Sequence, residues 1–100
     1  MTTSAARTLV VLDPTAPPRD LRHTMALRLP DLRGRSLGFL WNSKPNGDIL
    51  FSRLEELLRQ KYEITSVMYR RKPTASIPAE TLALEELAAG VDAVVIGLGD

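Results

Sequence analysis

The sequence contains no cysteine and a single histidine, His23. The absence of cysteine excludes disulfides, zinc–thiolate centres and thiol nucleophiles from these 100 residues. His23 has no second imidazole with which to share a metal ion, and it lies in a polar, proline-flanked stretch. We therefore interpret it as a solvated surface residue, and we expect neither a metal site nor a bound cofactor.

Long apolar runs and an excess of one charge are also lacking. No run approaches the roughly 18–20 residues needed to span a membrane. The N-terminal run TLVVL ends at Asp13 and Pro14, too early for a signal-peptide core. The formal net charge of +1 gives no reason to expect nucleic-acid binding. We therefore expect a cytoplasmic protein of one domain at most, with no membrane and no nucleic-acid partner.

Proline divides the chain into two parts. Pro14, Pro17 and Pro18 break any regular pattern near the N-terminus, and a basic, irregular stretch follows as far as a turn at Gly34. We interpret residues 1–35 as an N-terminal arm, in which only Thr8–Leu12 could form a short strand. Residues 36–100 then form the domain.

A regular alternation of strands and helices begins at residue 36. Residues 36–41 (SLGFLW) and 63–70 (EITSVMYR) are short runs of the kind found in strands. Between them, Asn46 can cap a helix, and Glu55 and Arg59 are spaced as a helical ion pair. Four leucines recur at helical spacing and should face the core: Leu50, Leu54, Leu57 and Leu58.

The second half adds a helix and a third strand. Pro78 suits the first position of a helix that Gly90 ends. The run VDAVVIGL, residues 91–98, is apolar in its core without interruption, which predicts a strand buried on both faces. This order predicts an α/β fold of three layers around a parallel three-stranded sheet. We favour the strand order 2-1-3 of a flavodoxin-like or Rossmann-like half-domain, with the helices on opposite faces.

That topology would bring three loops together. Ligands of such sheets bind beyond the carboxyl ends of the strands, where Asn42–Asn46, Arg70–Ser76 and Gly97–Asp100 would meet. The loop WNSKPN offers an amide, a hydroxyl, an ammonium and helix-opening N–H groups to an oxyanion, although an ordinary polar loop with a helix cap looks the same. Arg70, Arg71 and Lys72 could clamp a small anionic ligand or form a solvated basic loop.

Three motifs resemble one known family. GFLWNSKPNGDIL, RRKPTAS and AVVIGLGD are similar to the N-terminal half of the UGSC family, which is regarded as a family of selenoproteins, and the resemblance covers about Arg33 to Asp100. In that family a GxGD pattern is followed directly by a Sec/Cys-Gly-Ser-Cys tetrad, from which redox or other thiol/selenol chemistry is inferred. The resemblance implies the following binding residues: Asn42, Ser43, Lys44, Pro45, Asn46, Arg71, Lys72, Pro73, Thr74, Gly97, Gly99 and Asp100.

The tetrad itself is not in this sequence, so no catalytic residue is predicted here. We expect the chain to be the truncated N-terminal portion of a UGSC-like protein, ended where a UGA codon for selenocysteine was read as a stop, and inactive by itself. The full-length form would be a thiol/selenol redox or nucleophilic enzyme acting on a small anionic substrate. Two alternatives stay open. One is a non-catalytic small subunit whose third-strand edge pairs with a complementing chain or a second copy, and the other is a simple anion- or nucleotide-binding module.

Overall fold

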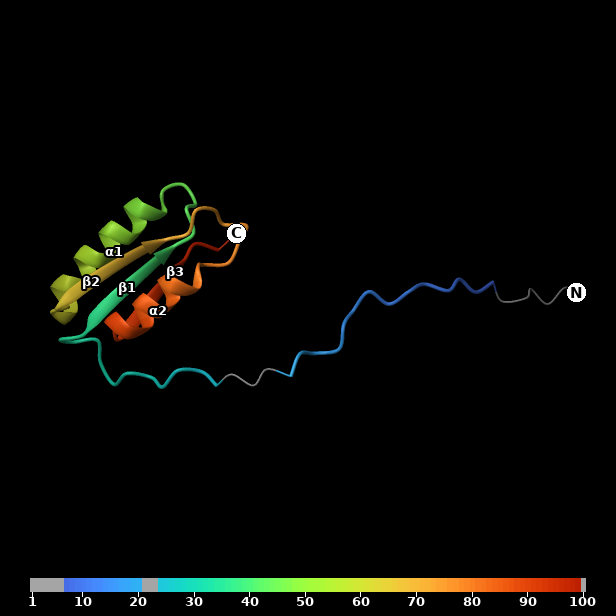
Figure 1. Cartoon of the computed structure of the whole chain (residues 1–100), viewed down its shortest axis with the longest axis horizontal. Coiled ribbons are helices and arrows are strands. Elements are labelled where there is room, and N and C mark those ends of the chain that lie inside the picture. Colours follow the sequence, from blue (N-terminus) through green and yellow to red (C-terminus); the bar gives the residue numbers. More distant parts are fainter. Residues whose placement is uncertain (1–6, 21–23, 100) are drawn as a thin grey trace, which may run out of the picture.

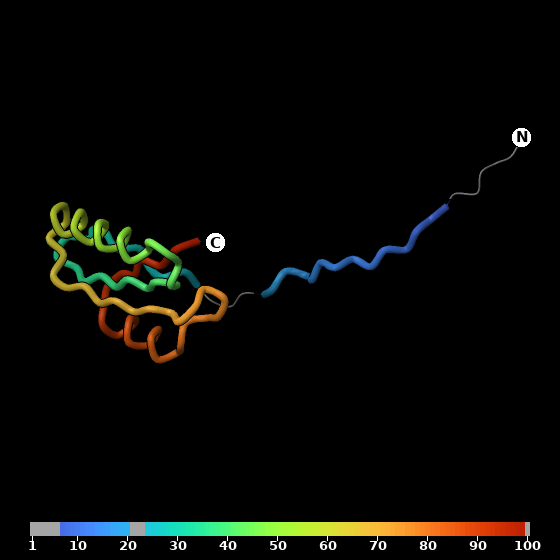
Figure 2. The backbone as a smooth tube through the Cα atoms, turned by 90° about the horizontal axis from the view of Figure 1, so that it is seen from above, coloured from blue at the N-terminus to red at the C-terminus, as the bar shows by residue number. Residues whose placement is uncertain are grey.

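Two helices and three strands alternate along the chain. The computed structural model describes residues 7–20 and 24–99, and its elements are β1 (Ser36–Trp41), α1 (Gly47–Tyr62), β2 (Ser66–Arg71), α2 (Thr81–Gly90) and β3 (Ala93–Gly97). Figures 1 and 2 show the strands as a central layer, with α1 on one face and α2 on the other. The predictions for His23 and Asp100 lie outside the described residues.

The sheet is parallel, and its strand order is β2-β1-β3. Phe39 in the middle of β1 stands in register with Tyr69 of β2 and with Val95 of β3. The predicted α/β fold and its 2-1-3 order are therefore confirmed. Because β1 has a neighbour on each side and a helix over each face, it forms the centre of the domain.

The largest part of the core lies between the sheet and α1. Leu37, Phe39, Phe51 and Ile64 form a buried cluster, in which Phe39 has no exposed surface. The Phe39 ring centroid lies 5.2 Å from that of Phe51 and 5.0 Å from that of Tyr69. Burial of such side chains contributes about 1.5–3 kcal/mol each, so these rings hold α1 to the sheet.

The leucine stripe predicted for α1 is only half right. Leu54 and Leu58 pack against the core, whereas Leu50 and Leu57 are 51% and 44% exposed. Phe51 occupies the central buried position instead. It lies three and seven residues before Leu54 and Leu58, and therefore on the same helical face.

The helix starts also differ from the predictions. Asn46 is the residue that precedes α1, but it adopts a left-handed conformation (φ 69°) and makes no side-chain capping hydrogen bond. The second helix begins at Thr81 with Glu80 before it, and not at Pro78. The Glu55–Arg59 ion pair of α1 is confirmed, with Arg59 Nε 3.0 Å from Glu55 Oε2.

The other face of the sheet is covered by α2. Leu87 is its buried residue, and a Cβ added to Gly38 of β1 would lie only 2.7 Å from Leu87 Cδ2. Glycine at this position leaves room for the Leu87 side chain, which a larger residue would displace. Glu86 of α2 is also bound to Arg70 of β2, with Nε and Oε2 2.6 Å apart. These contacts place α2 over β1 and β2.

β3 is not buried on both faces, and that prediction is wrong. Ala93 and Val95 pack against the α1-side core, whereas Val94 and Ile96 on the opposite face are 38% and 72% exposed. The reason is its position in the sheet. Among the described residues β3 pairs with β1 alone, and α2 lies over the two other strands.

Of the N-terminal arm, residues 7–20 lie away from the domain (Figures 1 and 2). Thr8–Leu12 does not form a strand here, which contradicts the prediction, and its four apolar side chains are 75–90% exposed. At the root of the arm, Leu32 packs against the core and Gly34 N donates to Tyr62 O at 3.1 Å. The domain boundary at residue 35 stays a prediction. Within the described ranges, neither helix has the length and apolar character needed to cross a membrane.

Candidate functional site

Asn42 joins the end of β1 to the segment that follows β3. Its backbone N donates to Gly97 O at 3.0 Å, and its side-chain Nδ2 donates to Leu98 O at 2.5 Å. Its Oδ1 accepts from Leu98 N at 2.9 Å and from Lys44 N at 3.3 Å. Both the nitrogen and the oxygen of the side-chain amide are thus hydrogen-bonded, so Asn42 holds the β1–α1 loop against the segment that follows β3.

Ser43 joins the same loop to the end of β2. Its Oγ donates to Lys72 O and accepts from Arg71 Nε at 2.9 Å. The backbone of Lys72 also donates to Trp41 O at 2.8 Å. Ser43 has a φ of 68°, which is uncommon outside glycine, and its two side-chain bonds are consistent with a position that the fold imposes.

Arg71 lies against the indole of Trp41. Its guanidinium carbon is 4.6 Å from the ring centroid, which is the distance of a cation–π contact. Trp41 Nε1 donates to Lys44 O at 2.9 Å, so the ring is fixed to the β1–α1 loop. A Cβ on Gly47 would lie 2.2 Å from Trp41 Nε1, which shows how closely the indole packs on the start of α1.

The three consecutive cations of the β2 end separate from one another. Arg70 points to the α2 side, where it binds Glu86 and donates to Tyr69 O at 2.7 Å. Arg71 points to the α1 side, toward Ser43 and Trp41. Lys72 Nζ donates to Ala75 O at 3.3 Å within its own loop. Alternation along β2 explains the split between Arg70 and Arg71.

The remaining predicted residues lie around this centre. Thr74 Oγ1 is 3.1 Å from Ser76 Oγ, so it structures its own loop. Gly97 lies against Phe51, whose Cζ would be 3.2 Å from an added Cβ, whereas Gly99 has open space around it. Asn46 is exposed at the start of α1.

The loops that follow β1 and β2 carry positive charge. The segments 42–46 and 71–76 contain Lys44, Arg71 and Lys72 and no carboxylate. The described contacts of Arg71 use its Nε and its ring-facing surface, so the terminal nitrogens are the atoms that a ligand would meet. A guanidinium held in this way can bind an oxyanion through two parallel hydrogen bonds.

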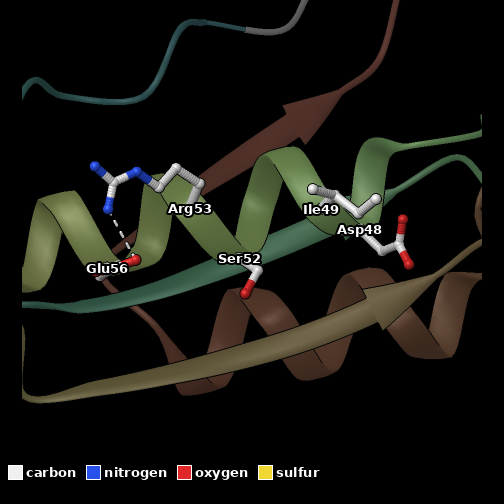
Figure 3. A pocket seen from close by; sticks show the side chains of 5 residues that line it. All are labelled: Asp48, Ile49, Ser52, Arg53 and Glu56. Atoms are coloured by element: carbon white, nitrogen blue, oxygen red, sulfur yellow. Dashed lines mark ion pairs between the residues drawn. The ribbon is translucent and has the colours of Figure 1, made fainter.

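Two hollows of the described structure lie elsewhere. One, of about 520 Å³, runs along the outer side of α1 (Figure 3) and is lined by Asp48, Ile49, Ser52, Arg53 and Glu56. An Arg53–Glu56 ion pair of 2.9 Å borders it. The other, of about 390 Å³, lies between the arm root and the start of β3. Neither includes the loops that converge at the carboxyl ends of the strands.

Trp41 and Gly47 were not among the predicted site residues. Both lie in the motif that carries the family resemblance, but a sequence shows no contact between an indole and a guanidinium thirty positions away. The signal is the register, in which Trp41 is paired with Arg71 across β1 and β2. That pairing follows only once the two strands have been aligned.

The fold and this site define a parallel α/β protein whose polar and basic loops gather at the carboxyl edge of its sheet. The chain belongs to the UGSC family, because the model of that family matches residues 10–100. The match begins in the arm, earlier than the Arg33 at which the resemblance was expected to start. Searches of curated proteins and of solved structures gave no match.

Proposed function

We propose that the converging loops bind a small anionic ligand, with Arg71 as the main binding group. The observation that carries this proposal is the fixed position of Arg71 between Ser43 Oγ and the Trp41 ring. An arginine that is already ordered loses less side-chain entropy when it binds. Lys44 and Lys72 add positive charge in the same loops, and Asn42 holds the segment after β3 beside them.

NMR titration of the ¹⁵N-labelled chain with acetate and with inorganic phosphate tests this binding. We expect saturable shifts of the backbone amides of Ser43, Lys72 and Leu98 and of the Arg71 Nε–H. Arg71→Ala should weaken binding at least about tenfold, as for loss of a charge-assisted bidentate pair. Arg70→Ala is the matched control, since Arg70 lies on the other face with Glu86, and should leave binding within about twofold. Equal losses in the two variants, or no saturable shift in the parent, would reject the proposal.

The resemblance to the family adds a proposed chemistry. We propose that the anion is the substrate of a thiol/selenol redox or nucleophilic centre, of the kind that the Sec/Cys-Gly-Ser-Cys tetrad supplies after GxGD in the family. A thiolate or selenolate near Arg71 and Lys72 would be stabilised by their charge, which lowers the pKa of the group and keeps it reactive at neutral pH. The residues of this chain would bind and orient the substrate.

The coding sequence beyond the Asp100 codon tests that chemistry. A UGA or cysteine codon followed by codons for Gly-Ser-Cys supports this chemistry. Codons after Asp100 that do not encode the tetrad, with UGA read either as a stop or as selenocysteine, contradict it. A cytoplasmic location stays a prediction, which a fluorescent fusion would test.

A second candidate function is that of a subunit. It is favoured by the exposure of Ile96 and by the pairing of β3 with β1 alone among the described strands. A complementing chain that carries the tetrad would then associate through this strand. Co-purification with the product of a neighbouring reading frame that contains the tetrad would support this function, and a site that binds and turns over substrate without any partner would oppose it.

A further inference from the structure

The outer edge of β3 is open in the described structure. β3 is hydrogen-bonded to β1 on one side, and no described strand pairs with its other side. Ile96 and Val94 also expose apolar surface next to that edge. Natural proteins protect such edges with charges, proline or a covering segment, because an open apolar edge pairs readily with another strand. The five residues of β3 carry no charge and no proline.

Thr8–Leu12 has the properties of a strand without a partner. It is five residues long, as β3 is, and Leu9, Val10, Val11 and Leu12 are exposed at 75–90%. Valine and threonine favour extended backbone, and four neighbouring exposed apolar side chains are costly in water. Beyond it, Asp13 Oδ1 accepts from Thr15 N at 2.9 Å and from Thr15 Oγ1 at 2.6 Å, which forms a turn that ends the run.

We propose that Thr8–Leu12 pairs with the outer edge of β3 in a second copy of the chain, so that two copies exchange their arms. Each copy would gain a fourth strand, and each exposed Ile96 would be covered. Main-chain hydrogen bonds supply the affinity in this mode of recognition, and the alternating side chains supply the specificity. Exchange of an identical segment closes a two-fold dimer.

Charge favours a parallel direction for the added strand. In a parallel register Thr8 lies opposite Ala93 and Val11 opposite Ile96, so that Arg7 comes beside Asp92. In the antiparallel register Asp13 would come beside Asp92 instead. Like charges directly opposite one another destabilise a strand pair, and opposite charges stabilise it.

The partner copy fits better than the arm's own domain. Residues 7–20 are described as an extended run that leads away from the domain, and the chain reaches 81 Å along its longest axis (Figures 1 and 2). Return to its own β3 would require the chain to reverse direction after Leu12, where Pro14, Pro17 and Pro18 favour an extended, stiff segment. The arm root does not fill the edge either, because a hollow of about 390 Å³ separates Ala26–Leu29 from Asp92–Val94.

Engineered cross-links test both the partner and the register, since the chain has no cysteine of its own. The double variant Val11→Cys with Ile96→Cys places the two thiols opposite each other in the parallel register. Mild oxidation should then give a disulfide-linked dimer on a non-reducing gel, at least about tenfold faster than for Leu9→Cys with Ile96→Cys, because the paired strands raise the effective concentration of the thiols. A predominantly intramolecular disulfide would overturn the exchange between copies. Equal rates for the two variants would overturn the register.

Sedimentation of the cysteine-free chain provides the second measurement. The parent should be dimeric at high micromolar concentration and dissociate on dilution. Val11→Asp should be monomeric, whereas Ala16→Asp adds the same charge beyond the proposed strand and should remain dimeric. A parent that is monomeric throughout, or a Val11→Asp variant that dimerises as the parent does, would overturn the proposal. These outcomes do not depend on whether the loops bind an anion.

Discussion

β1 and β3 are similar in sequence and differ in burial. Both are short apolar runs, SLGFLW and AVVIG, yet residues 37–40 of β1 are all buried, whereas β3 alternates between half-buried and exposed positions. β1 has a strand on each side and a helix over each face. Within residues 7–20 and 24–99, β3 has one neighbouring strand, and no helix packs on Ile96 as Leu87 of α2 packs on Gly38. The comparison teaches that an apolar run shows only that a strand can be buried. The strands and helices packed around it decide whether it is buried.

The largest loss of stability is expected for a substitution at the centre of β1. Phe39→Ala removes a fully buried ring that contacts Phe51 and Tyr69, and it should lower the free energy of unfolding by about 3–5 kcal/mol. Urea denaturation followed by circular dichroism measures this loss. Val94→Ala on β3 is the control, with an expected loss of about 1 kcal/mol or less. Similar losses at the two positions would remove the contrast between the strands.

A smaller effect is expected where β1 ends. Gly47→Ala places a Cβ 2.2 Å from Trp41 Nε1, and the rigid indole must shift. We expect a net loss of about 1–2 kcal/mol, because overpacking costs about 1–3 kcal/mol and alanine recovers part of it through helix propensity. The matched control is Gly90→Ala, whose Cβ meets only the flexible end of Met68 and should be close to neutral. A Gly47→Ala variant as stable as Gly90→Ala would show that the indole is free to move.

The contact of β2 with α1 predicts a pH dependence. Burial, followed by the 2.8 Å hydrogen bond to Glu55, raises the pKa of Tyr69 to about 12. The same hydrogen bond lowers the pKa of the Glu55 carboxyl, with a smaller contribution from Arg59. The stabilisation of the fold by the Tyr69–Glu55 hydrogen bond is thus complete between about pH 4.5 and 10. It is lost as the pH rises above 10 toward 12, and as the pH falls below 4.5.

Tyr69→Phe isolates this contribution. It should cost about 1 kcal/mol at pH 7, as for one hydrogen bond to a charged acceptor at a partly exposed site. Thermal melts of the parent and the variant at pH 3.5, 7 and 11 measure the difference, which should narrow at both extremes. A constant difference across this range would contradict the link between this hydrogen bond and the ionisation of Tyr69 and Glu55. A difference near zero at pH 7 would show that Tyr69 stabilises by the packing of its ring alone.

The smallest change in stability is expected for a substitution on the exposed face of β3. Ile96→Asn should change the free energy of unfolding by less than about 0.5 kcal/mol when measured at a concentration at which the chain is monomeric. Leu40→Asn on β1 is the contrasting variant, since it places an amide in a buried position and should cost several times more. A large loss for Ile96→Asn in the monomer would mean that the chain itself covers this side chain in solution.

The sequence was sufficient for the topology and for the convergence of the loops at one edge of the sheet, whereas their use as a binding site stays a prediction. Alternating strand and helix patterns with short connections predict the 2-1-3 parallel sheet, and the topology alone then brings Asn42, Ser43 and Lys72 to one edge. The hydrogen bonds of Asn42 to Leu98 and of Ser43 to Lys72 agree with that convergence.

What could not be predicted depends on contacts between distant segments. The exposure of Leu50 and Leu57 follows from the choice of Phe51 as the central contact with Phe39, which helical periodicity does not decide. The different directions of Arg70 and Arg71 follow from the pleat of β2, and the exposure of Ile96 follows from the lack of a described neighbour beyond β3. The run Thr8–Leu12 has strand propensity, but a strand requires a partner.

The packing of Trp41 has a practical consequence. It is the only tryptophan of the sequence, and its ring contacts Arg71, the Lys44 carbonyl and Gly47 at once. Its emission therefore reports on one place in the molecule, without any label. A ligand that draws Arg71 away from the ring would change the quenching of the indole, so unidentified compounds can be screened by fluorescence before their chemistry is known.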